Sequence, residues 1–134
     1  MGNKNCQYIS GMPVGYFNTD FKKRKMNRKI TKDEFRKEVM ASTQLSLVKF
    51  KTDWSGTCQI IEPIYNDLAK SYKGMVNFFT VDVEAEKGIE KEYSIMELPT
   101  ILFFRAGKIV DHAVGLTSRN ILISKIENAI APNN

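Results

Sequence analysis

The sequence predicts an α/β fold in which a central mixed β-sheet is flanked by helices. The first observation is an early alternation of apolar extended segments with amphipathic helical segments, which is typical of parallel strands joined by crossovers. The second is a late pair of apolar segments, 100–104 and 108–114, separated by Ala106 and Gly107, which predicts an antiparallel hairpin. The chain of 134 residues is long enough for one domain of this kind.

The charge distribution separates a basic tail from a nearly neutral domain. Residues 1–30 carry seven Lys or Arg and one Asp, a net charge of +6, whereas residues 31–134 carry thirteen Lys or Arg and fourteen Asp or Glu, a net charge of −1. Residues 1–25 lack a sustained period, so we predict an N-terminal appendage at 1–25 and one domain at 26–134. The basic run at 22–25 is either a solvated linker or a contact for phosphates, and no base-reading motif accompanies it.

Composition excludes several classes of protein. No apolar run approaches the ~20 residues needed to span a bilayer, and residues near Met1 lack the apolar core of a signal peptide, so we expect a cytoplasmic protein. The two cysteines, Cys6 and Cys58, cannot form a disulfide framework. Together with the single histidine, His112, they fall short of a four-ligand zinc site. We therefore predict neither a metal nor a cofactor, and we expect His112 on a strand surface.

A capping box opens the first predicted helix. The hydroxyl of Thr31 can accept from the backbone N–H of Glu34, and the Glu34 side chain can reach back to the N–H of Thr31. The helix should continue to about Met40. Phe35 and Val39 lie four residues apart on one face, which we expect to be buried.

The central strand is predicted at 44–51, with a short edge strand before it at 26–30. Side chains alternate between the two faces of a strand. One face carries Val48 and Phe50, and the other carries Leu45, Leu47 and Lys49. A parallel strand covered by helices on both faces is continuously apolar, and Lys49 breaks this pattern close to the cysteine.

A long amphipathic helix is predicted at 56–72. Apolar residues recur along it at a spacing of 3.6 residues: Ile60, Ile61, Ile64, Tyr65, Leu68, Ala69 and Tyr72. Pro63 lies inside this helix and should kink it, because proline has no N–H to donate. Gly74 is predicted as the C-terminal cap.

The remaining elements are a strand, a short polar helix, the hairpin and a last helix. The strand at 75–83 should present Val76 and Phe78 on one face, opposite Phe79, Val81 and Val83. The short helix is predicted at 86–93. The last helix is predicted to begin at the cap residue Thr117 and to end near Ile130, with Leu122, Ile126 and Ala129 facing inward.

The segment at 54–59, Trp-Ser-Gly-Thr-Cys-Gln, carries the chemistry. Cys58 falls in the first turn of the long helix, near unpaired N–H groups and the positive end of the helix dipole. Both features favour thiolate, the reactive form of cysteine. Ser55 is placed to cap the helix, and its hydroxyl is hardly ionised near neutral pH without an activating base.

This segment, followed by Pro63, resembles the thioredoxin active-site motif Trp-Cys-Gly-Pro-Cys-Lys. Four later segments resemble further features of the family in the same order: the end of its third strand at 81–83, its cis-proline turn at 98–100, its hairpin at 103–108, and the glycine before its last helix at 114–115. The resemblance covers about residues 26–134. It implies a thioredoxin-like fold and a part in thiol–disulfide redox homeostasis.

Three functional positions depart from the family pattern. Ser55 stands where the family has its attacking cysteine, Thr57 where it usually has proline, and Lys49 where it usually has a buried aspartate. The resemblance makes Cys58 the resolving cysteine and leaves no attacker, so we expect weak or absent disulfide-reductase turnover. It also implies that partners are bound by Trp54, Gly56, Thr57, Leu98 and Pro99.

The sequence leaves the enzymatic activity open between two functions. The first is a redox protein that acts through the single thiol of Cys58, with protein partners that carry cysteines or disulfides and a thioredoxin-reductase-type or small-thiol reductant. The second is a redox-silent module that binds extended or cysteine-containing partners. Cys58 is accordingly either a reactive thiol or a buried, inert one. Cys6 is a hypothetical second thiol, since the tail is long enough to reach back.

Lys49 has two interpretations. A neutral amine could assist proton transfer at Cys58, where the family uses its aspartate. Alternatively, the stem packs in the core and the ammonium reaches water or a carboxylate.

Overall fold

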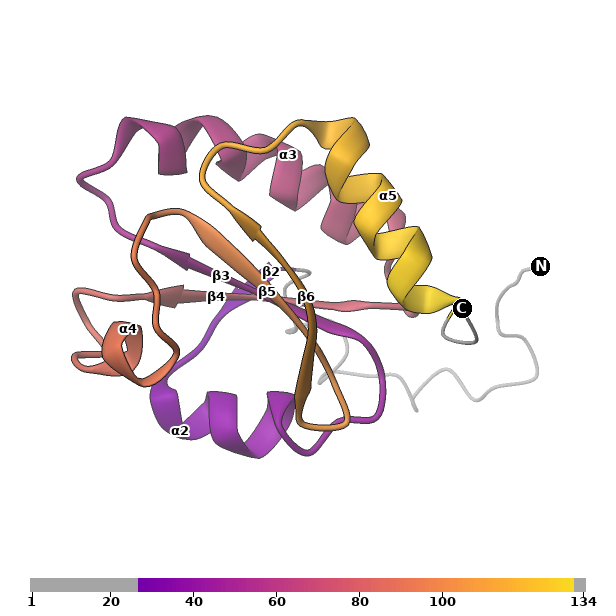
Figure 1. The fold of residues 1–134 in the computed structure, drawn as a ribbon, viewed down its shortest axis with the longest axis horizontal. Helices are drawn as coiled ribbons and strands as arrows, with labels where there is room; N and C mark the ends of the chain where they lie inside the picture. The colour runs from indigo at the N-terminus through magenta and orange to yellow at the C-terminus, as the bar shows by residue number, and fades with distance from the viewer. Residues whose placement is uncertain (1–26, 132–134) are drawn as a thin grey trace, which may run out of the picture.

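The computed structural model describes residues 27–131 and contains one five-stranded sheet between two layers of helices (Figure 1). Helices α3 (Gly56–Ser71) and α5 (Arg119–Ile130) lie on one face, and α2 (Lys32–Glu34) lies on the other. This arrangement confirms the predicted α/β fold. The predicted appendage at 1–25, including Cys6, lies outside the described residues.

The sheet is mixed, as predicted. Its strand order is β2-β4-β3-β5-β6. The strands are β2 (Asn27–Lys29), β3 (Ser46–Lys51), β4 (Asn77–Asp82), β5 (Thr100–Arg105) and β6 (Lys108–Val114). Strands β2 and β3 both run parallel to β4, whereas β5 runs antiparallel to β3 and β6 antiparallel to β5. Strand β3 therefore lies in the middle of the sheet and delivers its C-terminal end to the cysteine-containing segment.

The hairpin between β5 and β6 turns where the sequence predicts. Ala106 and Gly107 both have positive φ, 52° and 79°, the conformation of a two-residue turn that matches strand twist. A Cβ atom on Gly107 would lie 3.1 Å from the carbonyl oxygen of Met40. Glycine at position 107 therefore suits both the positive φ of the turn and the short distance between the turn and the backbone of Met40.

The first helix has the predicted cap but a wider second turn than predicted. The Thr31 hydroxyl accepts from the N–H of Glu34 at 3.1 Å, and the Glu34 carboxylate accepts from the N–H of Thr31 at 2.9 Å. The chain then passes into the π-helix η2 (Phe35–Val39), in which the N–H of Met40 donates to the carbonyl of Phe35. Phe35 and Val39 are buried as expected. The predicted helix to about Met40 is therefore present, and its second turn is a π-turn because a four-residue apolar spacing does not distinguish an α-turn from a π-turn.

The later helices agree in position but differ at their ends. Helix α4 (Ile89–Glu92) is shorter than the predicted 86–93, and the C-cap of α3 is Tyr72, with Gly74 in a left-handed turn two residues further on. The N-cap of α5 is Ser118, whose hydroxyl accepts from the N–H of Ile121 at 3.3 Å. Thr117 instead donates to the carbonyl of Gly115 at 3.2 Å. Two adjacent hydroxyl residues offered the same capping chemistry, and the turn at Gly115 decided between them.

The sheet divides the core into two apolar clusters. The cluster beneath α3 and α5 includes Leu45, Leu47, Val76, Phe78, Leu122 and Ile126. The cluster on the opposite face includes Phe35, Val48, Phe50, Phe79, Val81 and Val83. These sets confirm the alternation predicted for both central strands. Ala129 packs, partly buried, against the first cluster.

Candidate functional site

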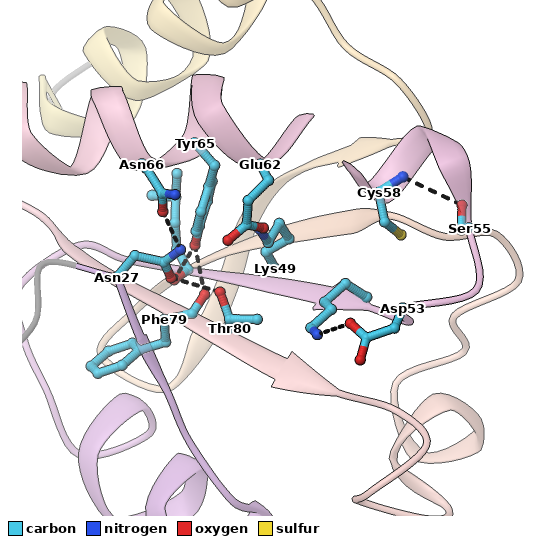
Figure 2. Close-up of polar contacts among 12 residues, drawn as sticks. Asn27, Lys49, Asp53, Ser55, Cys58, Glu62, Tyr65, Asn66, Phe79 and Thr80 are labelled. Carbon is cyan, nitrogen blue, oxygen red and sulfur yellow. Dashed lines mark hydrogen bonds and ion pairs between the residues drawn. The ribbon is translucent and has the colours of Figure 1, made fainter. Parts of the chain in front are cut away.

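The cysteine-containing segment joins the end of β3 to the start of α3. Trp54 is 85% exposed, whereas Cys58 is only 3% exposed and carries a free thiol. Figure 2 shows Cys58 in the first turn of α3, beside Ser55, with its thiol directed toward the sheet. Gly56 and Thr57 are exposed between them. The segment thus presents an aromatic ring and two small residues at the surface and keeps its thiol inside.

A directed chain of hydrogen bonds occupies the Ser55 hydroxyl. Its oxygen accepts from the backbone N–H of Cys58 at 3.3 Å, which confirms the predicted helix cap. The Thr57 hydroxyl donates to the carbonyl of Leu98 at 3.4 Å, so Ser55 is the donor in the 2.8 Å contact between the two hydroxyls. Among residues 27–131, Ser55 therefore contacts no base that could take its proton, and its oxygen stays a neutral cap.

The proline turn lies directly beside this segment. The Leu98–Pro99 peptide bond is cis. The Pro99 carbonyl accepts from the N–H of Gly115 at 2.7 Å, and the Leu98 carbonyl accepts from Thr57 as described. The fold thus brings together the cysteine-containing segment, the proline turn and Gly115, which are far apart in the sequence. All the residues predicted to form the partner-binding surface lie on the cysteine-containing segment or on the proline turn.

Lys49, on β3, has a fully buried side chain that lies beneath α3. Its Nζ pairs with the carboxylate of Glu62 on α3 and lies 4.7 Å from the centroid of the Tyr65 ring (Figure 2). Burial lowers the pKa of Lys49, although the hydrogen bond and charge of Glu62 oppose this effect. Of the two interpretations of Lys49, the contact with a carboxylate is the one present. Assistance to Cys58 stays a prediction.

Glu62 is the site residue that the sequence reading missed. Its side chain is 46% exposed and links the buried ammonium to the surface. The sequence contains a signal for this pairing, because Glu62 is the only carboxylate in residues 56–63 of the helix and lies one turn after Cys58. A buried lysine requires a paired carboxylate, and the nearest helix offered one.

The described residues contain neither a candidate metal-binding cluster nor a helix that could span a membrane. Within residues 27–131 no group of three or more His, Cys, Asp or Glu is placed to hold a metal ion. In the same part of the chain, no helix is long and apolar enough to cross a bilayer. His112 lies exposed on β6, as expected.

The fold and the site together define a class of protein. A mixed sheet between two helical layers, a cysteine in the first turn of the long helix and a cis-proline turn beside it constitute the thioredoxin-fold arrangement for thiol–disulfide chemistry.

Comparison with known proteins identifies the family. The thioredoxin family model matches residues 26–128. Thioredoxin of Rickettsia felis is 33% identical over 105 residues, which cover 78% of this chain and 100% of that protein. Thioredoxin of Chlorobaculum thiosulfatiphilum is 32% identical over 100 residues, covering 75% of this chain and 93% of that protein. Thioredoxin H4 of Arabidopsis thaliana is 36% identical over 80 residues, which cover 60% of this chain and 67% of that protein.

The chain belongs to the thioredoxin family. Membership supports a thiol–disulfide redox role in general and implies partners such as disulfide-containing proteins.

Gly115, whose N–H donates to the carbonyl of Pro99, has a left-handed backbone conformation that disfavours a side chain. Its φ is 76°, and a Cβ atom would lie 2.5 Å from Oε2 of Glu97. We expect Gly115→Ala to lower the free energy of unfolding by about 1–2 kcal/mol, the usual cost of a left-handed L-residue. Urea unfolding measures this loss. In the control Gly56→Ala, a Cβ atom would have no neighbour within 4 Å, so stability should hold or rise. Equal losses in both variants would contradict the prediction.

Proposed function

We propose that this chain acts in thiol–disulfide redox homeostasis by docking partner proteins beside a single active-site thiol, with weak or absent disulfide-reductase turnover. One observation carries the proposal: the position of the attacking thiol holds a hydroxyl that is engaged as a helix cap, 3.3 Å from the N–H of Cys58. Turnover of a dithiol enzyme needs one thiolate to attack and a second thiol to resolve the mixed disulfide. Here only one of the two is present in the segment.

The docking surface does not depend on the missing thiol. Trp54, in the cysteine-containing segment, is 85% exposed, and Met96, three residues before Pro99, is 93% exposed. Large apolar side chains this exposed favour a surface that contacts a partner. Thr57 supports the same surface, because its hydroxyl ties the motif to the carbonyl of Leu98.

Cys58 is the thiol through which a partner would be held. Its thiolate would attack a disulfide sulfur of the partner, form a mixed disulfide and release the other sulfur as thiolate. A small thiol or a reductase of the thioredoxin-reductase type would then reduce the mixed disulfide and regenerate Cys58. We propose the cytoplasm as the location, because reducing conditions there keep an unpaired cysteine free.

The burial of Cys58 favours a second candidate function. A thiol that is 3% exposed could be inert, and the chain would then be a redox-silent module that binds extended or cysteine-containing partners. Docking is common to both functions. They differ in whether Cys58 reacts while the protein is folded.

Reaction with oxidised glutathione separates the two functions. The Cys6→Ser variant leaves Cys58 as the only cysteine, and mass spectrometry then counts adducts on the folded protein. We expect one glutathione adduct at Cys58 without denaturant, in agreement with the single-thiol function. An adduct that forms only in denaturant would contradict it and support the redox-silent module. Cys58→Ser in the same background is the control and should stay unmodified.

A further inference from the structure

We propose that the docking surface selects extended protein segments in which a basic side chain neighbours an apolar one, and that Glu97 determines this specificity. The inference rests on the docking function proposed above and adds the class of partner. Its three supports are an unpaired carboxylate, the charge of the surrounding segments and a hollow beside them.

The Glu97 carboxylate lies beside Gly115 and has no partner among residues 27–131. Its backbone precedes the cis-proline turn, where its carbonyl accepts from the Thr100 hydroxyl at 2.6 Å. Its Oε2 lies against the bare Cα of Gly115, only 2.5 Å from where a Cβ atom would be. Among residues 27–131, no hydrogen bond or ion pair reaches this side chain. An exposed anion held beside the proline turn is available to a cation from a partner.

The segments that frame the surface carry no opposing charge. Residues 53–60, 93–104 and 112–118 contain two carboxylates, those of Asp53 and Glu97, and neither Lys nor Arg. Asp53 is already paired with Lys51 at 2.6 Å. Glu97 is thus the one unpaired carboxylate in these three segments. A basic segment would complement this surface, and an acidic one would be repelled.

A hollow next to Glu97 provides room for an apolar side chain. It has a volume of about 350 Å³, and its lining includes Met96, Leu102, Ile109 and Val114. Glu97 is one of its lining residues. Ile109 and Val114, on the edge strand β6, are each 50% exposed, so this apolar lining is open to solvent. An extended segment can place an apolar residue in the hollow and its basic neighbour against Glu97.

Trp54 allows a direct test, because it is the single tryptophan and is 85% exposed at the surface in question. The probes are three short peptides that share the centre Phe-Ser-Leu and carry Lys, Ser or Glu pairs on both sides. None contains cysteine, so redox chemistry does not enter. Fluorescence titration of the full chain should show the Lys peptide binding about fivefold more tightly than the Ser peptide, and the Glu peptide binding most weakly. Salt should reduce these differences.

Two variants complete the test. Glu97→Gln should abolish the preference for the Lys peptide over the Ser peptide, whereas Asp33→Asn, which removes an exposed carboxylate from α2 that does not line the hollow, should keep it. Equal affinities for the three peptides in the unchanged chain would overturn this inference and leave docking intact. A Trp54 signal unmoved by all three would overturn both proposals. A signal that changes with protein concentration alone would assign the surface to a second copy and overturn the partner proposed here.

Discussion

Ser55→Cys should convert this chain into a disulfide reductase, with turnover higher by on the order of 100-fold or more, because it supplies the attacking nucleophile that catalysis requires. The new thiol would stand at the start of α3, where the N–H of Cys58 now donates to the Ser55 oxygen. Unpaired N–H groups at a helix start stabilise thiolate. Cys58, in the first turn, would resolve the mixed disulfide. The measurement is reduction of a protein disulfide with dithiothreitol as electron source.

Two controls define what the result means. Ser55→Ala should remain as inactive as the unchanged chain, and Ser55→Cys combined with Cys58→Ser should lose the gained turnover. If the unchanged chain already turns over, Cys58 is reactive by itself and an external thiol or Cys6 resolves the intermediate. If Ser55→Cys stays inactive, the replacement of proline by Thr57 or of aspartate by Lys49 has disabled the scaffold, and our account of the intact docking surface is wrong.

Glu62→Gln should lower the free energy of unfolding by about 3 kcal/mol, because it leaves the buried Lys49 ammonium without a counter-charge. The Lys49 side chain is 0% exposed, so water cannot replace the lost carboxylate directly. Since Glu62 is itself 46% exposed, we place the loss at the lower end of the range for broken buried pairs. Urea unfolding at neutral pH measures it. Asp53→Asn breaks the exposed pair with Lys51 and, as the matched control, should change stability little.

The same pair predicts a pH dependence with a defined sign. The pKa of Lys49 is lowered in the folded state from its ordinary value of 10.5, chiefly by burial. Between the lowered value and 10.5, the unfolded state binds more protons at this residue, so its contribution makes the free energy of unfolding rise with pH in that window. Lys49→Met should remove this contribution. Glu62→Gln should extend the pH window downward, because the loss of the carboxylate lowers the pKa of Lys49 further. A pH profile of Lys49→Met that matches the unchanged chain would contradict the assignment.

Combining Lys49→Met with Glu62→Gln tests whether the two residues act as a pair. If they do, the double variant should be more stable than Glu62→Gln alone, because no buried charge is left without a partner. Additive losses would show instead that each residue stabilises the fold through separate contacts.

Local patterns predicted the elements well because their causes are local. The alternation along β3 assigned Leu47 and Val48 to opposite clusters, and the side-chain oxygens of Thr31 and Ser55 cap helices three residues or fewer from their partners. The π-turn at Phe35 and the choice of Ser118 over Thr117 as a cap were not predictable in the same way. In both cases the sequence allows two hydrogen-bonding patterns, and at the last helix the bond from Thr117 to the carbonyl of Gly115 leaves Ser118 as the cap.

Local patterns were enough to predict the order of the elements, the two faces of the sheet, the helix cap at Ser55 and the lack of a second thiol beside Cys58. They could not predict that Thr57 donates to Leu98, that Lys49 pairs with Glu62 or that the Glu97 carboxylate lies against Gly115. The difference arises from distance along the chain. Periodicity and capping act within one or two turns, whereas these contacts arise when packing brings separate segments together and excludes water from their polar groups.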